Sequence, residues 1–220
     1  MYNIEVFDKY FEEYDKWYEE NRFVYLSELN AVKELIPEFK FGVEIGVGTG
    51  RFALPLGIEI GVEPSISMAK ISKSRGLIVL QAMAEDLPFR SNSFDLVLMI
   101  VTICFVRDPT KSMREANRIL KNDGTLVLGI IDKNSFLGKL YEKRHLNSVF
   151  YKEVKFFSVS DLINMLTNTG FYDFEYRQTV FKYPRDIKNV EHVEIGCGRG
   201  GFVVISAKKK AYVGQIKNVV

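Results

Sequence analysis

The first 40 residues carry apolar side chains at helical spacing. Aromatic residues recur there at steps of three and four, with Asp, Glu and Lys between them: Phe7, Tyr10, Phe11, Tyr14, Trp17 and Tyr18. Such steps place side chains on one face of a helix, so the pattern predicts helix over residues 2–36. Asn21 is expected to interrupt it, and a second helix over 23–35 should end before Pro37. The aromatic face either packs against the rest of the domain or covers a bound ligand.

From residue 41 onward, short apolar runs alternate with amphipathic segments. The runs have the length of buried strands and are expected at Phe41–Gly46, Gly57–Val62, Leu77–Gln81, Phe94–Ile103 and Thr125–Ile131. Helices are expected between them at Thr49–Leu56 and Ser65–Ser74, and a third should begin at Pro109 with Asp108 as its N-cap. Strands and helices that alternate in this way predict a parallel sheet with right-handed crossovers.

After residue 132 the alternation stops. A polar segment with scattered aromatic residues, 134–155, gives no clear periodicity. Ser158 and Asp161 form a capping box before a helix over 159–168. Two strand-like stretches follow, Phe171–Tyr183 and Gly201–Ala207. Because few residues separate them, they are expected to pair antiparallel.

Composition narrows the class of protein only a little. The 220 residues have 47% hydrophobic and 26% charged residues and a formal net charge of +2. This balance gives no reason to expect a nucleic-acid partner. The longest apolar run, Phe94–Val106, is shorter than a membrane-spanning helix, and the N-terminus has no basic-then-apolar signal. Cys104 and Cys197 lack metal-site or redox spacing. We therefore expect a soluble cytoplasmic protein without a metal, and Cys104 as a small buried apolar residue.

Two glycine-rich segments, Val43–Phe52 and Val193–Phe202, have nearly the same sequence. We call them the first and the second glycine patch. The first lies between a predicted strand and helix, where glycine lets backbone N–H groups approach a ligand closely. Its pattern is E-x-G-x-G-x-G. A dinucleotide fingerprint would need its third glycine at Arg51, and no lysine follows at the position that a nucleoside triphosphate loop requires. An NAD-dependent oxidoreductase is therefore disfavoured.

A carboxylate completes the first patch. Glu63 lies at the end of the second predicted strand, seventeen residues after Gly46. There it can accept hydrogen bonds from the two hydroxyls of an adenosine ribose; the alternative is an ordinary surface Glu at a strand end. The second patch is followed by too few residues for a similar site. It is expected to form a hairpin turn or bulge, or else a loop beside the substrate.

Five segments together resemble class I S-adenosylmethionine-dependent methyltransferases of the type 11-like family. They are the glycine loop Val43–Phe52 with Glu63, the segment Gln81–Phe89, the strand entry Ser93–Val97, the helix and strand Glu115–Leu128, and the element Ser158–Phe171. The segments occur in family order and at family spacing over residues 41 to about 180. The resemblance implies transfer of a methyl group from S-adenosylmethionine, with S-adenosylhomocysteine as product, to an O, N or C nucleophile. The acceptor is expected to be a small molecule.

The resemblance also implies an α/β fold with a doubly wound Rossmann-like sheet. The sheet should be mostly parallel, in the order 3-2-1-4-5-7-6 with an antiparallel final strand, and preceded by a helical N-terminal extension. One domain is expected over residues 1–220. Its parts would be a helical N-terminal cap (1–40), a cofactor-binding core (41–132), an insertion over the site (133–157) and a C-terminal helix and hairpin (158–220).

Site residues follow from the matched positions. The glycine loop should pass under the methionine part of the cofactor, Glu44 should orient its amino group and Glu63 should hold the ribose. Adenine contacts are expected from Pro64, Ser65, Met83 and Ala84, with Glu85 as a substitute for the acidic or amide side chain that the family often has at Met83. Cofactor-binding positions are thus Glu44, Gly46, Val47, Gly48, Gly50, Glu63, Pro64, Ser65, Met83, Ala84, Glu85 and Ile100, the last at the end of the fourth strand.

Candidates for substrate contact are weaker. Tyr14 and Trp17 would belong to a lid, Arg22 could meet the cofactor carboxylate, and Asp132, Tyr141 and Tyr151 lie in segments that usually cover such sites. No catalytic residue is assigned. Methyl transfer mainly requires that the nucleophile is aligned with the methyl group and that water is excluded. Neither His145 nor His192 falls in a motif. Two alternatives stay open: a binding module that holds the cofactor without transfer, and a methyltransferase acting on protein or RNA. The oligomeric state is not indicated.

Overall fold

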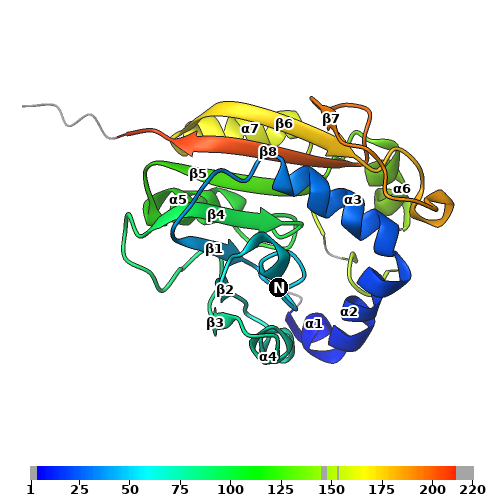
Figure 1. The fold of residues 1–220 in the computed structure, drawn as a ribbon, viewed down its shortest axis with the longest axis horizontal. Helices are drawn as coiled ribbons and strands as arrows, with labels where there is room; N and C mark the ends of the chain where they lie inside the picture. Colours follow the sequence, from blue (N-terminus) through cyan, green and yellow to red (C-terminus); the bar gives the residue numbers. More distant parts are fainter. Residues whose placement is uncertain (1–3, 145–147, 153, 212–220) are drawn as a thin grey trace, which may run out of the picture.

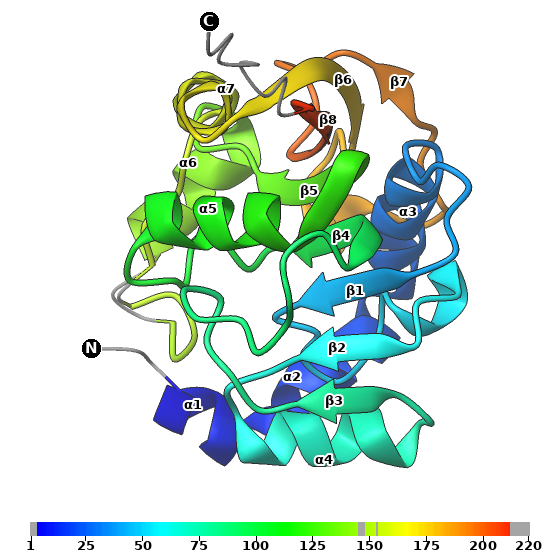
Figure 2. The same cartoon turned by 90° about the vertical axis from the view of Figure 1, so that its left-hand side faces the viewer.

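The computed structural model describes residues 4–144, 148–152 and 154–211. Within them an eight-stranded sheet has the order β3-β2-β1-β4-β5-β8-β6-β7, with helices on both faces (Figures 1 and 2). The strands are β1 Gly42–Ile45, β2 Ile60–Val62, β3 Ile78–Leu80, β4 Phe94–Ile100, β5 Leu120–Ile131, β6 Phe171–Thr179, β7 Glu194–Ile195 and β8 Phe202–Lys209. The helices are α1 Ile4–Lys9, α2 Phe11–Glu20, α3 Arg22–Lys33, α4 Ile66–Ser74, α5 Pro109–Ile119, α6 Phe136–Arg144 and α7 Val159–Asn168.

The strand directions confirm the predicted doubly wound sheet. β1 to β5 pair in parallel, and β8 runs antiparallel between β5 and β6. This is the predicted order 3-2-1-4-5-7-6, since β8 is the predicted seventh strand. The structure adds one short strand, β7, which pairs antiparallel with β6 at the edge of the sheet.

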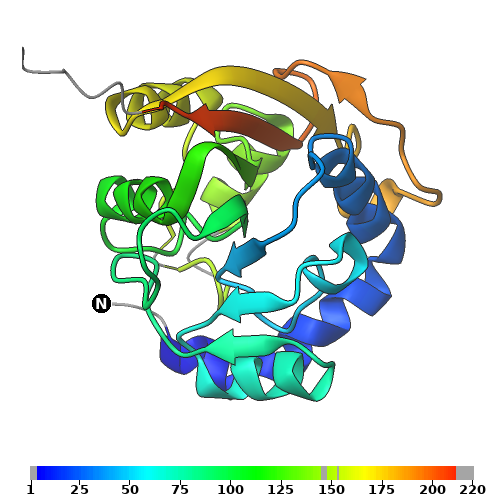
Figure 3. The ribbon, with the colours of Figure 1, turned by 60° about the vertical axis from the view of Figure 1, so that its left-hand side comes forward.

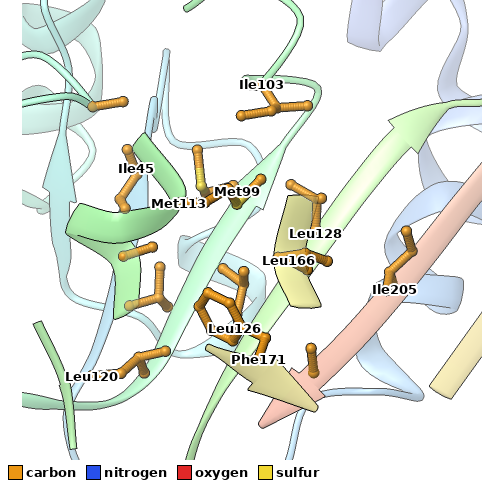
Figure 4. Close-up of a cluster of buried hydrophobic side chains, with 14 of the residues drawn as sticks. Ile45, Met99, Ile103, Met113, Leu120, Leu126, Leu128, Leu166, Phe171 and Ile205 are labelled. Carbon is orange, nitrogen blue, oxygen red and sulfur yellow. The ribbon is translucent and has the colours of Figure 1, made fainter. Parts of the chain in front are cut away.

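Two apolar layers cover the sheet, one on each face. Along β4, Val97 and Met99 pack into the layer under α5 and α7, whereas Leu96 and Leu98 pack into the layer under α3 and α4. The alternation is the two-residue period of a strand that is buried on both sides. Figure 4 shows the first layer, where Met113 of α5 and residues of α7 and β5 surround Met99.

Three helices begin as their sequences predict. The side chains of Ser65, Asp108 and Ser158 accept hydrogen bonds from the first turns of α4, α5 and α7. In α7 the capping box with Asp161 is complete. These caps satisfy backbone N–H groups that have no partner within the helix.

The N-terminal region differs from its prediction in the number of helices. A break at Tyr10 separates α1 from α2, and the break at Asn21 lies where it was predicted. α1 packs against α4, while α3 packs against β6 and β8. The three helices therefore bend around the sheet from its β3 side to its β8 side (Figure 3).

Several predicted elements are shorter in the structure, such as β2 and β6, which are expected over Gly57–Val62 and Phe171–Tyr183. The backbone explains two further cases. Thr49–Leu56 is not an α-helix but a turn followed by the three-residue 3-10 helix Leu54–Leu56, because Gly50 has a φ of +85° and Pro55 has no N–H to donate. The fourth strand ends at Ile100 rather than Ile103, because Val101 adopts a φ of +50°. The prediction that Cys104 is buried is confirmed.

The last strand is longer than predicted. β8 extends to Lys209, two residues beyond the predicted end at Ala207. Lys209 is buried, and its ammonium group donates to Asn92 Oδ1 and to the Leu120 carbonyl. The second glycine patch connects β7 to β8, which lie on either side of β6 and do not pair with each other, so it is not the predicted hairpin turn. Within it the N–H groups of Arg199 and Gly200 bind Gln178 Oε1. No helix in the described part of the chain is long and apolar enough to cross a membrane.

Candidate functional site

A cavity of about 390 Å³ lies at the carboxyl ends of the parallel strands. The last residues of β4 and β5 and residues that follow β1, β2, β3 and β4 line it, together with side chains from α1, α2, α3, α4 and α6. The chain order reverses direction at β1, which has β2 on one side and β4 on the other. Ligands of open α/β sheets bind in the crevice at such a switch point. The four ionisable acids of the lining are Glu13, Glu28, Glu63 and Glu85, and no Lys, Arg or His is among the described lining residues.

The glycine loop after β1 has the conformation that its sequence requires. Gly46, Gly48 and Gly50 all have positive φ values, of +71°, +53° and +85°. A Cβ at Gly46 would collide with the Thr102 side chain, which forms a wall of the cavity. Gly46 and Gly48 line the cavity, and the N–H groups of Gly46 and Val47 bind the carbonyl of Val62. The loop is therefore fixed to the end of β2.

Val47 and Gly50 support the loop from behind rather than line the cavity. A Cβ at Gly61 would lie 2.5 Å from Val47 Cγ1, so Val47 packs directly on the backbone of β2. A Cβ at Gly50 would meet Leu77 at 2.7 Å. Both positions let the loop lie close to β2 and to the start of β3.

Glu63 is held in place by backbone donors on both sides. Its Oε2 accepts from the Gly48 N–H (2.8 Å) and its Oε1 from the Ser65 N–H (2.9 Å). Burial raises the pKa of Glu63 to about 7, although these two donors favour the ionised form. Each oxygen keeps a further lone pair, so the carboxylate can accept two hydroxyl groups, as binding of a ribose requires.

Glu44 lies beneath the loop and does not reach the cavity. The side chain is buried and its Oε2 has no hydrogen-bond partner in the described structure. Burial holds the pKa of Glu44 well above its usual value, and the charge of Glu63 raises it further. Glu44 therefore lies behind the lining of the cavity, and its contact with the cofactor amino group stays a prediction.

The predicted adenine positions divide into two groups. Pro64, Met83, Ala84 and Glu85 line the cavity. Glu85 Oε1 accepts from the N–H groups that precede α5, whereas its buried Oε2 has no partner in the described structure. A buried acceptor without a donor is costly unless a ligand supplies one. Ser65 does not line the cavity, because its hydroxyl caps α4 and donates to Asp8 Oδ1.

Aromatic side chains enclose the other end of the cavity. Tyr14, Trp17 and Tyr18 enter it from α2, and the hydroxyls of Tyr14 and Tyr18 are hydrogen-bonded (2.9 Å). A Cβ at Gly48 would lie 3.4 Å from the Tyr14 hydroxyl, which therefore sits over the glycine loop. Tyr151 stacks on Tyr141 of α6 with centroids 5.2 Å apart, and both rings line the cavity. The aromatic face of α2 thus covers the site.

Two aspartates fix this N-terminal lid, residues 4–20, to the rest of the protein. The Asp15 carboxylate pairs with Arg51 and with Arg75, each at 2.6 Å. These cations hold the pKa of Asp15 well below its usual range. Asp8 accepts from the Ser65 hydroxyl and the Ser67 N–H at the start of α4. Arg51, the residue that breaks the dinucleotide fingerprint, is thus an anchor for the lid.

Some predicted residues lie elsewhere. Arg22 is exposed at the start of α3 and does not line the cavity. Asp132 is buried directly after the lining residue Ile131, and its carboxylate accepts from the Asn134 N–H. His192 is exposed next to Glu194, and His145 lies outside the described residues. Ile100, which ends β4, lines the cavity as predicted.

Other lining residues carry no recognised sequence signal, among them Thr102, Phe105 and Glu28. Thr102 follows the turn at Val101, Phe105 packs on Phe7 of the lid (5.1 Å), and Glu28 projects from α3. Thr102 lies two residues after Ile100, and this closeness to a predicted site position is the one signal that could have pointed to it.

Comparison with known proteins identifies the family. A model of the methyltransferase domain matches residues 43–128. An uncharacterized protein of Methanocaldococcus jannaschii is 49% identical over 208 residues, which are 94% of this chain and 100% of that protein. An uncharacterized protein of Mycobacterium tuberculosis is 36% identical over 205 residues, 90% of this chain and 72% of that protein.

A solved structure agrees along almost the whole chain. It is a SAM-dependent methyltransferase from Thermotoga maritima, named a possible histamine N-methyltransferase, with 51% identity and a TM-score of 0.92. The match covers 96% of this chain and 100% of that one. With the glycine loop, Glu63 and the strand order in place, the chain belongs to the class I S-adenosylmethionine-dependent methyltransferases.

Proposed function

We propose that the protein transfers a methyl group from S-adenosylmethionine to a small molecule that occupies the aromatic end of the cavity. One observation carries this proposal. A single cavity runs from the glycine loop and Glu63 to the rings of Trp17 and Tyr151. A nucleoside cofactor and an acceptor can therefore lie in one enclosed space, which is the arrangement that direct transfer between them requires.

The residues present fit this cofactor. Two backbone donors hold Glu63, and each of its oxygens keeps a lone pair for a ribose hydroxyl. The loop has glycine at Gly46, where a Cβ would collide with Thr102, and Glu85 offers an unpaired acceptor beside Met83. The cofactor, when bound, supplies a methyl group on a positively charged sulfur. The chain itself orients both partners and excludes water through the lid.

The enclosure favours a small acceptor over a protein or nucleic acid. α1 and α2 cover the cavity. The ion pairs of Asp15 with Arg51 and Arg75 fix α2 there, and the hydrogen bonds of Asp8 fix α1 to the start of α4. No cationic side chain is among the described lining residues, whereas nucleic-acid binding depends on Lys and Arg contacts to phosphate.

Thermal unfolding with S-adenosylhomocysteine and with NAD tests the cofactor. A ligand at 100 times its Kd adds about 2.7 kcal/mol, which for a chain of this size raises the Tm by roughly 5–10 °C. Glu63→Ala should lose most of this rise. Glu59→Ala is the matched control, because Glu59 is exposed at the opposite end of β2. An equal rise in the Glu63 variant, or a larger one with NAD, would refute the proposal.

A second experiment separates an enzyme from a binding module. The protein is incubated with S-adenosylmethionine, labelled in its methyl group, and a small-metabolite extract. Formation of S-adenosylhomocysteine together with a labelled small product supports transfer. Binding of the cofactor without either product, over many extracts, would favour the module.

A further inference from the structure

Glu28 is the least explained group in the cavity. The side chain comes from the middle of α3, has 6% of its surface exposed and lines the cavity. Its carboxylate makes no hydrogen bond and no ion pair within the described residues. A buried carboxylate without a partner is expensive, and an apolar side chain would stabilise the helix better. Burial raises the pKa of Glu28 to about 8, so the group is largely protonated at neutral pH when the cavity is empty. A cation bound beside it would favour its charged form.

The surroundings of Glu28 are aromatic. Tyr14 and Tyr18 from α2 and Tyr151 from the segment after α6 are the titratable groups that interact with its charge. Burial raises the pKa of all three phenols above the usual value, so they are neutral at physiological pH. Trp17 lines the same space. The faces of aromatic rings attract cations, and a quaternary or protonated amine is the usual ligand of such a cage.

Glu28 lies away from the expected nucleoside position. Its helix packs against β6 and β8, whereas Glu63 follows β2 on the other side of β1. Tyr14, whose hydroxyl lies near the glycine loop, and Glu28 both line the cavity. Glu28 thus faces the aromatic end of the cavity, where the acceptor would bind.

We propose that Glu28 and the surrounding rings bind the ammonium group of a small amine, and that Glu28 removes a proton from this ammonium before methylation. The inference rests on the proposed function and names its substrate class. An acidic and aromatic lining without a cation among its described residues admits an amine, but it gives an anionic acceptor such as a carboxylate or phosphate no partner.

The step balances in atoms and charge. The ammonium loses one proton to the Glu28 carboxylate and becomes a neutral amine with a free electron pair. That pair forms the new N–C bond while the C–S bond of the cofactor breaks and its electrons stay on sulfur. The products are a methylated ammonium, a neutral thioether and protonated Glu28, which returns its proton to water. Burial raises the pKa of Glu28 to about 8, which suits it to accept a proton near neutral pH.

The fluorescence of Trp17 gives a direct test of binding, because it is the only tryptophan of the chain and lines the cavity. Butylamine, benzylamine and 2-phenylethylamine are each titrated beside the alcohol and the carboxylate of the same size, with and without S-adenosylhomocysteine. At least one amine should bind ten times more tightly than its alcohol, and the carboxylates should not bind. If every amine binds no better than its alcohol, the proposal is wrong.

Variants assign the preference to Glu28. Glu28→Gln should lose the tenfold preference for amine while its affinity for S-adenosylhomocysteine stays within twofold, and Glu28→Asp should recover part of the preference. Glu12→Gln, on the exposed side of α2, is the control. A preference that survives in Glu28→Gln, or a loss of S-adenosylhomocysteine binding there, would overturn the proposal. If the unmodified protein fails to bind S-adenosylhomocysteine, the proposed function falls instead, and the amine titrations without it still decide the role of Glu28.

Discussion

At the scale of single residues, three buried carboxylates work against the folding of the empty protein. Burial raises the pKa of Glu28, Glu44 and Glu63 above the values these groups have in the unfolded chain. The unfolded state therefore ionises first as pH rises and binds fewer protons than the folded state, so the free energy of unfolding decreases with pH. Sites of this kind exchange stability for ligand binding.

The pH dependence can be assigned to Glu28 with one substitution. Glu28 ionises near pH 4.5 in the unfolded chain and near 8 when folded. Glu28→Gln removes this difference, so the variant should gain stability relative to the unmodified protein as pH rises between these values, by a few kcal/mol at most. Urea unfolding at pH 5 and pH 8 measures the gain. Glu12→Gln should show no such trend. If the difference in unfolding free energy between Glu28→Gln and the unmodified protein is the same at pH 5 and pH 8, the expected pKa of Glu28 is wrong.

Sequence patterns locate some of these residues and miss others for a physical reason. The spacing of Gly46, Gly48 and Glu63 predicts a site because the loop after one parallel strand and the end of the next strand lie side by side. Glu28 reads as an ordinary polar position of an amphipathic helix. Its burial depends on rings such as Tyr14, which come from other elements and reach it only after folding. Glu44 matches the family pattern, yet it lies beneath the loop.

At the scale of elements, the N-terminal lid controls access to the cavity. Periodicity predicts helix for α2, with its aromatic face, and for α3, but it cannot predict where these helices dock. Contacts between residues far apart in the chain set the docking of the lid. Asp15 forms ion pairs with Arg51 and Arg75, and Asp8 accepts a hydrogen bond from the start of α4. Such partly buried, charge-assisted contacts are worth more than exposed ion pairs.

Weakening one anchor should speed ligand release. Asp15→Asn leaves Arg51 and Arg75 close together without their shared carboxylate, so the lid should open more often. The dissociation rate of S-adenosylhomocysteine should rise about tenfold, since tenfold corresponds to about 1.4 kcal/mol. Stopped-flow fluorescence of Trp17 measures this rate. The control is Glu20→Gln, which affects only an exposed pair with Lys16; an unchanged rate in Asp15→Asn would show that the lid does not limit release.

At the scale of the whole molecule, the sheet order is the most predictable feature. Alternating strands and helices with right-handed crossovers leave few arrangements for β1 to β5. The short strand β7 could not be predicted, because its two residues, Glu194 and Ile195, join the sheet only through pairing with β6.

The two thiols should report local and global opening separately. Cys197 is exposed, whereas Cys104 is buried and its pKa is raised to about 12. One thiol should react with a chromogenic disulfide reagent in the folded protein and two in denaturant. The reaction of Cys104 should follow the unfolding rate, because its surroundings, including Phe156 and Phe157, must separate first. Two rapidly reacting thiols in the folded protein would contradict this packing.

The position of α3 has a consequence for biosynthesis. This helix precedes every described strand of the sheet in the chain, yet it packs against β6 and β8, of which β8 follows all the other described strands. Since contacts between distant parts of a chain form only when both parts exist, the wall that carries Glu28 is completed only after β8 has been made. The strand ends around the glycine loop are in place earlier, so a nascent chain builds the end that faces the methyl donor before the end that receives the acceptor.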